Sequence, residues 1–81
     1  MTRTEIEQQV RQFLIEELEV DPERVTPDAR LREDIGIDSL DLVDIVVIVD
    51  RVFHFRIKTE DMAEVATFSQ FCDYIEAHLR A

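Results

Sequence analysis

The chain has 81 residues, enough for one small domain, and its composition excludes several classes of protein. A single cysteine excludes an intrachain disulfide scaffold, and one glycine with two prolines excludes collagen-like and low-complexity chains. The formal charge is −10, which disfavours binding to nucleic acid or anionic membranes and favours basic protein partners. We therefore expect one domain over residues 1–81.

No segment has the pattern of a signal peptide or a membrane span. The polar N-terminal sequence lacks the apolar stretch of a signal peptide. The longest unbroken apolar run, 45–49, is far shorter than the roughly 20 residues of a membrane span. We expect a cytoplasmic protein without stable membrane insertion, and the small size argues against an enzyme with a walled pocket.

The first predicted helix covers about 5–19. Thr4 is its predicted N-cap, and Glu7 completes a capping box three residues later. Apolar side chains recur at helical spacing and form the predicted buried stripe: Ile6, Val10, Phe13, Leu14 and Leu18. The pair Asp21-Pro22 then begins a short turn, with Pro22 suited to a first helical position.

A long irregular segment follows, at about 25–37. It is rich in turn-forming residues, and loops of this length are uncommon unless they are functional or held in place. Val25, Leu31 and Ile35 are spaced apolar residues that we expect to hold this segment against the core.

The segment 42–53 is rich in Val and Ile, which by propensity alone suits a strand. Two observations favour a helix instead. Asp38 can act as an N-cap, with Asp41 at the third helical position. In addition, Asp41, Asp44 and Asp50 fall at intervals of three and six rather than on alternate residues.

Two more helices are predicted in the last third of the chain. A short one covers 60–65 with Thr59 as its cap, and a longer one follows Thr67, where Gln70 completes a capping box. The longer helix has a regular apolar face: Phe68, Phe71, Cys72, Ile75 and Leu79. The predicted fold is all-α, a small antiparallel bundle of three main helices and one short helix, with a long loop between the first two.

The predicted central helix has two apolar faces. One carries Leu40, Val43 and Val47, and the other carries Ile45, Val49 and Phe53. In so small a protein we expect one face to be at least partly exposed, and an exposed apolar patch flanked by charge is typical of a docking site. The alternative is that both faces are buried, as in a central helix.

Ser39 lies at the first position of this helix. Six acidic residues and no basic residue occur between 33 and 50: Glu33, Asp34, Asp38, Asp41, Asp44 and Asp50. A phosphate on an outward-pointing Ser39 hydroxyl meets the positive end of the helix dipole, so the position suits a phosphoester. From the residues alone, an ordinary helix start with Ser39 as a second capping residue is the favoured alternative.

The stretch 33–41, EDIGIDSLD, resembles the modification motif of acyl carrier proteins, in which Asp-Ser-Leu opens the second helix. Further positions along the chain are family-like: Val25-Thr26, Leu31, Phe53, Thr67-Phe68 and Asp73-Tyr74-Ile75. The short motif is moderately specific. Motif, length, acidity and helix order together are highly specific.

The resemblance implies that Ser39 receives 4′-phosphopantetheine from a phosphopantetheinyl transferase. It also implies that acyl groups are bound as thioesters to the terminal thiol of this prosthetic arm. It implies that Asp38 helps the transferase position its metal and donor. It also implies a partner-binding face, made of Leu40, Asp41, Val43, Asp44 and Val47. The implied protein is a non-catalytic monomer.

The implied partners are acyl-transferring, condensing or ligating enzymes of fatty acid, lipid or polyketide biosynthesis, with basic docking patches. The helices could also part to shelter a fatty chain, and four aliphatic residues are plausible liners, although an ordinary core has the same residues: Leu31, Ile45, Val49 and Ile75.

Four basic residues depart from the acidic surface of common fatty-acid carriers: Arg51, His54, Arg56 and Lys58. A specialised carrier for polyketide, aminoacyl or other cargo is therefore an alternative, and simple solvation of a loop explains these bases equally well. An unmodified acidic helical interaction module is a further alternative.

The remaining candidates are weaker. Cys72 follows the apolar stripe of the last helix and is predicted to be a buried core thiol. His54 and His78 lack metal-ligand spacing, and the acidic run lacks the pattern of a calcium loop. The second glycine of a nucleophile elbow is missing after Ser39, so a serine hydrolase is unsupported. We expect no metal site and no catalytic residue.

Overall fold

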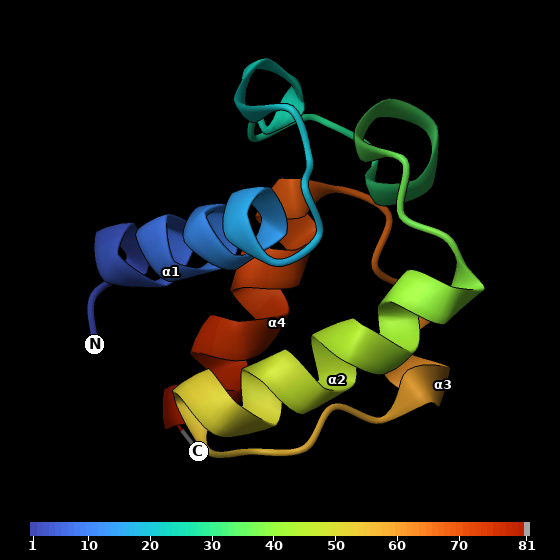
Figure 1. Cartoon of the computed structure of the whole chain (residues 1–81). Coiled ribbons are helices and arrows are strands. Elements are labelled where there is room, and N and C mark those ends of the chain that lie inside the picture. Colours follow the sequence, from blue (N-terminus) through green and yellow to red (C-terminus); the bar gives the residue numbers. More distant parts are fainter. Residues whose placement is uncertain (81) are drawn as a thin grey trace.

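The computed structural model describes residues 1–80, which form helices and turns without a β-strand. Its helical segments in chain order are α1 (Arg3–Glu16), η1 (Pro22–Arg24), η2 (Leu31–Ile35), α2 (Ser39–Phe53), α3 (Thr59–Met62) and α4 (Phe68–Arg80). Figure 1 shows α1, α2 and α4 as the long helices, with α3 beside the start of α2. The predicted all-α bundle of three main helices and one short helix is confirmed.

Helix α1 begins two residues earlier than predicted. The Thr2 hydroxyl accepts a hydrogen bond from the Glu5 amide at 3.2 Å, and Glu5 Oε1 accepts one from the Thr2 amide at 3.1 Å. The predicted capping box of Thr4 and Glu7 is therefore wrong. The sequence repeats the Thr-x-x-Glu pattern two residues apart, so pattern alone does not choose between the two starts.

A contact with α4 favours the earlier start. Within the helix, Arg3 donates a hydrogen bond to the Ser69 carbonyl at 3.0 Å and pairs with the carboxylate of Asp73. These partners lie 66 and 70 residues away in the sequence, on a helix that packs along α1. The long-range ion pair stabilises helical Arg3, and no local sequence signal reports it.

Helix α1 also ends earlier than predicted, at Glu16 rather than near residue 19. Glu19 adopts a left-handed backbone conformation, with φ of 57°, which stops the helix. The Val20 amide donates to the Leu14 carbonyl at 3.0 Å and closes the turn. Leu18, predicted as the last member of the buried stripe, packs half-buried against the core from this turn.

The segment 25–37 is held against the core as predicted, because Val25, Leu31 and Ile35 are all buried. It is more regular than predicted, since η2 is one π-helical turn that ends at Gly36 in a left-handed conformation, with φ of 88°. Two backbone hydrogen bonds of 2.9 Å fasten this loop to the start of α4: Leu31 to Ala66 and Phe68 to Ala29.

The short helix α3 departs from the prediction at both ends. Thr59 is its first residue rather than its cap, and the actual N-cap, Lys58, makes no side-chain hydrogen bond. The helix ends at Met62, and the amides of residues 63–65 each donate to the carbonyl three residues back, as in tight turns. The burial of Met62 holds this short element in place.

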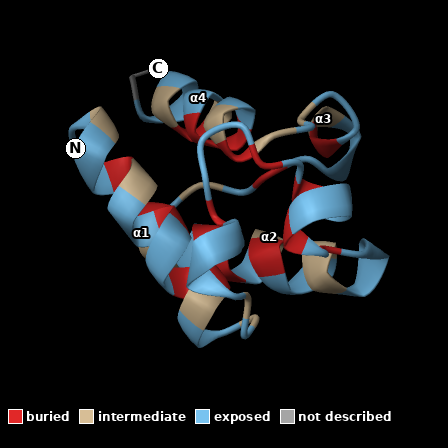
Figure 2. Cartoon of the chain, turned by 90° about the horizontal axis from the view of Figure 1, so that it is seen from above, coloured by how far each residue is buried: buried red, intermediate tan, exposed pale blue. Residues whose placement is uncertain are grey.

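Helix α4 begins as predicted, with the Thr67 hydroxyl accepting from the Gln70 amide at 3.1 Å. Four members of its predicted apolar face are buried: Phe68, Phe71, Cys72 and Ile75. Leu79 is 37% exposed, so the buried face stops short of the last turn. Figure 2 shows the buried residues on the inward faces of the helices, where they form one core.

Candidate functional site

The start of α2 is fixed by a reciprocal capping box. One carboxylate oxygen of Asp38, Oδ1, accepts hydrogen bonds from the Leu40 and Asp41 amides, both at 3.0 Å. Asp41 Oδ2 accepts in return from the Asp38 amide at 3.2 Å. The predicted cap is confirmed, and it holds the first turn of α2 in one conformation.

Ser39 is the first residue of this capped helix, and it is exposed. Within residues 1–80 its hydroxyl makes no hydrogen bond to the protein. A free, exposed hydroxyl is chemically suited to form a phosphodiester, and the positive end of the helix dipole favours an anion there. The residues present therefore fit a phosphate-linked prosthetic group.

Helix α2 has one buried and one exposed apolar face. Ile45, Ile48, Val49 and Phe53 belong to the core. Leu40 is 79% exposed, Val43 63% and Val47 61%. The structure thus confirms the expectation that one apolar face is at least partly exposed and rejects the alternative that both are buried.

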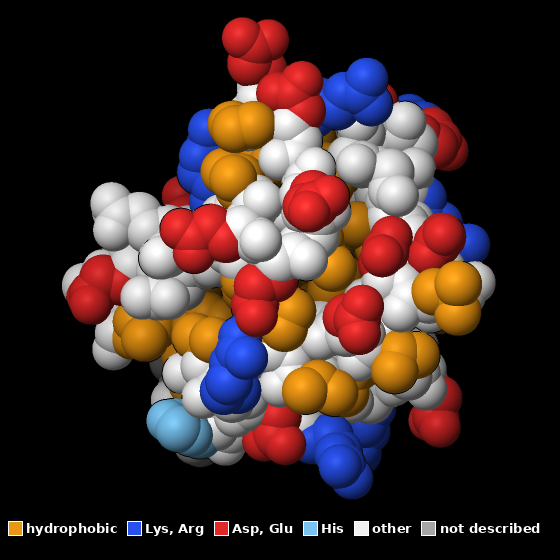
Figure 3. Space-filling model, in the orientation of Figure 1, with side chains coloured by type: hydrophobic (Ala, Val, Ile, Leu, Met, Phe, Trp, Pro, Cys, Tyr) orange, Lys and Arg blue, Asp and Glu red, His pale blue; other side chains and the backbone are white. Residues whose placement is uncertain are grey.

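Acidic side chains flank the exposed apolar face. Asp44 is exposed and Asp41 is partly exposed. Figure 3 shows hydrophobic and acidic side chains next to one another over α2. A small apolar patch surrounded by carboxylates is a surface that a partner with a basic rim and an apolar centre can recognise.

Arg51, one of the four basic residues that depart from the family pattern, is engaged with α1. Its Nη2 lies 2.6 Å from Glu17 Oε2, so this ion pair joins the end of α2 to the end of α1. The other three, His54, Arg56 and Lys58, are exposed. The pairing across 34 residues was not foreseen from the sequence, because helix-wheel geometry covers only one helix at a time.

A cavity of about 110 Å³ lies between η2, α3 and the start of α2. Four residues were predicted to line a shelter for the acyl chain, and one of them, Leu31, lines this cavity. Ile45, Val49 and Ile75 are buried in the core. Sequence reasoning missed Met62, Ala63 and Val65, which line this cavity, because α3 has too few residues to show a periodic face.

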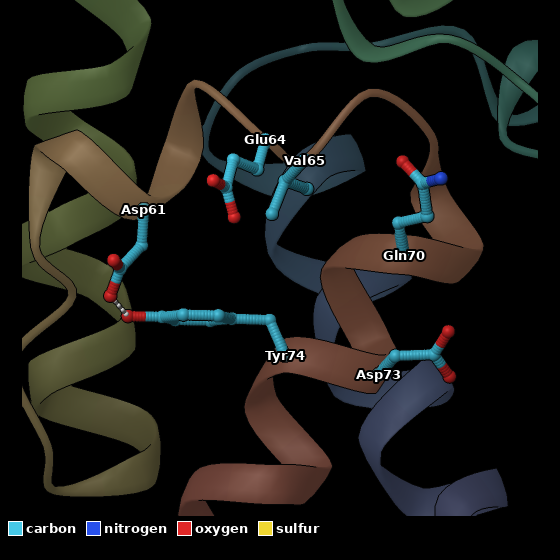
Figure 4. A pocket seen from close by; sticks show the side chains of 6 residues that line it. All are labelled: Asp61, Glu64, Val65, Gln70, Asp73 and Tyr74. Carbon is cyan, nitrogen blue, oxygen red and sulfur yellow. Dashed lines mark hydrogen bonds between the residues drawn. The ribbon is translucent and has the colours of Figure 1, made fainter.

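A second hollow, of about 510 Å³, lies between α3 and α4 and is lined by acidic residues together with Val65, Gln70 and Tyr74. Figure 4 shows the Tyr74 ring reaching from α4 to Asp61 on α3. The Tyr74 hydroxyl donates to Asp61 Oδ2 at 2.8 Å, and burial, aided by this hydrogen bond, raises the pKa of Tyr74. This contact fastens α3 to α4.

Cys72 is a core thiol, as predicted. It is fully buried and free of disulfide bonding, and burial raises its pKa to about 12. The thiol is therefore protonated at neutral pH and is a poor nucleophile.

The described part of the chain has neither a cluster of metal-binding side chains nor a helix suited to a membrane. Residues 1–80 contain no group of three or more His, Cys, Asp or Glu side chains placed to hold a metal ion. Over the same residues, no helix is both long and apolar enough to cross a membrane.

Comparison with known proteins identifies the family. The family model for the phosphopantetheine attachment site matches residues 8–75. An acyl carrier protein of Rubrobacter xylanophilus is 36% identical over 81 residues, which is the full length of both chains. The match disfavours the alternative of an unmodified interaction module. The chain belongs to the acyl carrier protein family, whose non-catalytic members carry acyl groups on the cofactor 4′-phosphopantetheine.

Proposed function

We propose that Ser39 is the residue to which 4′-phosphopantetheine is attached, and that residues 1–81 act as one carrier unit. The observation that carries the proposal is the exposed hydroxyl at the capped start of α2, inside the stretch that resembles the family motif. The other serine, Ser69, lies half-buried in the first turn of α4 near Arg3. When bound, the cofactor supplies a thiol that holds acyl groups as thioesters.

Asp38 has a double role in this proposal. Its Oδ1 atom holds the first turn of α2 through two backbone amides. Its Oδ2 atom makes no hydrogen bond within residues 1–80, and it is available to a metal ion brought by the phosphopantetheinyl transferase. The same side chain thus orients Ser39 and contacts the modifying enzyme.

The exposed face of α2 is the proposed docking surface for partner enzymes. Leu40, Val43 and Val47 supply its apolar part, and Asp41 and Asp44 supply its charge. Carboxylates at the rim steer a basic partner, while the small apolar area limits affinity, so that the carrier can leave each enzyme. The chain acts as a cytoplasmic monomer and a substrate of other enzymes rather than as a catalyst.

Two classes of cargo fit the proposed carrier. Acyl intermediates of fatty acid, lipid or polyketide biosynthesis are the first, and aminoacyl or other specialised cargo is the second. The exposed bases Arg56 and Lys58 favour enzymes other than those of common fatty acid synthesis, because they interrupt the acidic surface that follows α2. Loading assays with acyltransferases and with amino acid ligases distinguish the two classes.

Intact-mass spectrometry tests the attachment residue. The apo protein is incubated with coenzyme A and a phosphopantetheinyl transferase, in parallel with Ser39→Ala and Ser69→Ala. These are the only two serines in the chain, so the second variant is a matched control. We expect the wild type and Ser69→Ala to gain one phosphopantetheine group and Ser39→Ala to gain none. Modification of Ser39→Ala contradicts the proposal.

A further inference from the structure

Arg32 lies between two neighbouring cavities close to the start of α2. The first cavity, of about 110 Å³, is walled mainly by Leu31, Ile37, Leu42, Met62 and Val65, with Arg32 among its lining residues. The second, of about 390 Å³, shares Leu31, Arg32, Met62, Ala63 and Val65 with the first, and its remaining lining residues are Arg30, Glu33 and Ala66. The walls that the two cavities share are apolar apart from Arg32, so they make one recess in two parts with the Arg32 guanidinium beside both, while the ion-paired Arg30 and Glu33 line the second part only.

The recess begins next to the proposed attachment residue. Ile37 precedes Ser39 by two residues, Leu42 follows it by three, and both line the first cavity. A group tethered to Ser39 is therefore held close to this recess. The inference rests on the proposed function, because it concerns the cargo that the arm on Ser39 carries.

Arg32 has no charge partner in the described part of the chain. It makes no hydrogen bond and no ion pair within residues 1–80. Its neighbour Arg30, by contrast, lies 2.6 Å from the carboxylate of Glu33. In a chain with a net charge of −10, Arg32 thus presents a guanidinium group without a charge partner to the recess.

The chemistry of arginine indicates what the recess accepts. The aliphatic stem of arginine packs along apolar surface while the guanidinium head stays in water. That head binds a carboxylate through two parallel hydrogen bonds. A ligand complementary to this recess has an apolar middle and a carboxylate at its far end.

We propose that this carrier prefers short acyl cargo whose far end bears a carboxylate, and that Arg32 determines this preference. The methylene groups of the cargo pack against Leu31, Met62 and Val65, and the terminal carboxylate pairs with Arg32. Cargo of equal length that ends in a methyl group gains the same apolar contacts but leaves the guanidinium unpaired.

Two cargoes of equal chain length test the proposal. A promiscuous phosphopantetheinyl transferase loads the apo protein from glutaryl-coenzyme A or pentanoyl-coenzyme A, and intact mass verifies each product. Cleavage of each protein-bound thioester by hydroxylamine is then compared with cleavage of the same thioester on free pantetheine. We expect protection of glutaryl to exceed protection of pentanoyl roughly two- to five-fold, the range of an exposed ion pair.

Three variants assign the preference to Arg32. We expect Arg32→Gln to lose it and Arg32→Lys to keep part of it. Arg56→Gln is the matched control, because Arg56 is an exposed base that lines neither cavity, and it is expected to keep the preference. Circular dichroism verifies that each variant is folded, and Arg32→Lys tests the charge if Arg32→Gln does not fold.

The proposal is overturned by equal protection of both cargoes in the wild type, or by a preference for glutaryl that survives in Arg32→Gln. Equal loss of protection for both cargoes in Arg32→Gln also overturns it, because the guanidinium then contacts the arm, including its phosphate, rather than the end of the cargo. Failure of the wild type to gain mass at the loading step contradicts Ser39 attachment itself. That failure is seen before any thioester is cleaved, so the two ideas fail separately.

Discussion

At the scale of single residues, the start of α2 depends on Asp38. Its side chain satisfies two backbone amides that otherwise lack an intrahelical partner, and it lies next to the residue that we propose is modified. A carboxylate in this place therefore contributes both to the stability of the helix and to recognition by the modifying enzyme.

Substitution separates these two contributions. Asp38→Ala is expected to lower the free energy of unfolding by about 1 kcal/mol, the usual cost of losing an N-cap, whereas Asp38→Asn keeps most of the stability. Both variants are expected to be modified more slowly, because an amide is a weaker metal ligand than a carboxylate. Urea unfolding and the rate of mass gain measure the two effects. If Asp38→Asn is modified at the wild-type rate, a role of Asp38 in metal binding is contradicted.

The buried thiol of Cys72 gives a prediction on pH. In the unfolded chain this thiol ionises near its ordinary pKa of 9.0, whereas in the folded protein it stays protonated up to about 12. Because the folded pKa is raised, stability present below pH 9 is lost as the pH rises toward 12. The raised pKa of Tyr74 acts in the same direction.

Alkaline unfolding of two variants tests this linkage. The free energy of unfolding of Cys72→Ala is expected to be lower than that of the wild type at pH 7, because a buried side chain is truncated, but to fall less steeply above pH 9. Leu79→Ala, which changes an exposed apolar residue of the same helix, keeps the wild-type slope. Equal slopes for Cys72→Ala and the wild type are incompatible with a thiol protonated by burial.

At the scale of elements, local signals predicted α2 and the start of α4, and a long-range contact decided the start of α1. The caps Asp38 and Thr67 are local, so the sequence around each was sufficient to place it. The register of α1 was missed because Arg3 is held by residues of α4. The end of α3 at Met62 was missed because it depends on the burial of the Met62 side chain in the core, which no local pattern shows.

Helix α2 presents the proposed docking surface, and a charge reversal tests it. Asp44→Lys is expected to weaken binding to a cognate enzyme several-fold, because it places a base opposite a basic partner. Asp28→Lys makes the same change of charge at an exposed position in the loop and is the control. Titration calorimetry or surface plasmon resonance measures both. An equal effect of the two variants indicates that net charge, rather than this face, determines binding.

At the scale of the whole molecule, a charge of −10 is carried by a compact body with a radius of gyration of 11.4 Å. That radius is close to the value expected for a folded chain of this length. The ion pairs that the structure shows, such as those of Arg3 and Arg51, relieve part of the repulsion, but the carboxylates along the exposed face of α2 remain close to one another.

Salt is therefore expected to act in opposite directions on folding and on docking. Added NaCl or MgCl₂ raises the melting temperature, because it screens repulsion among carboxylates, and it weakens binding to a basic partner enzyme. Differential scanning calorimetry and a binding titration over the same salt series measure the two effects. A melting temperature that does not change with salt contradicts the repulsion, and binding that does not change contradicts electrostatic docking.

The sequence predicted the place of the proposed attachment residue but not its surroundings. The motif around Ser39 is contiguous, so it was visible in one chain without a structure. The recess beside it is built from η2, α3 and the start of α2, and its walls come together only in the folded protein. Arg32 therefore appeared in the sequence as one charged loop residue among several.

Peptide mapping of the modified protein tests the central claim most directly. After incubation with coenzyme A and a phosphopantetheinyl transferase, trypsin releases the peptide 33–51, which contains Ser39, separately from the region that contains Ser69. We predict that tandem mass spectrometry places one phosphopantetheine group on Ser39 in that peptide. A fully unmodified peptide 33–51, or a group located on any other residue, contradicts the account.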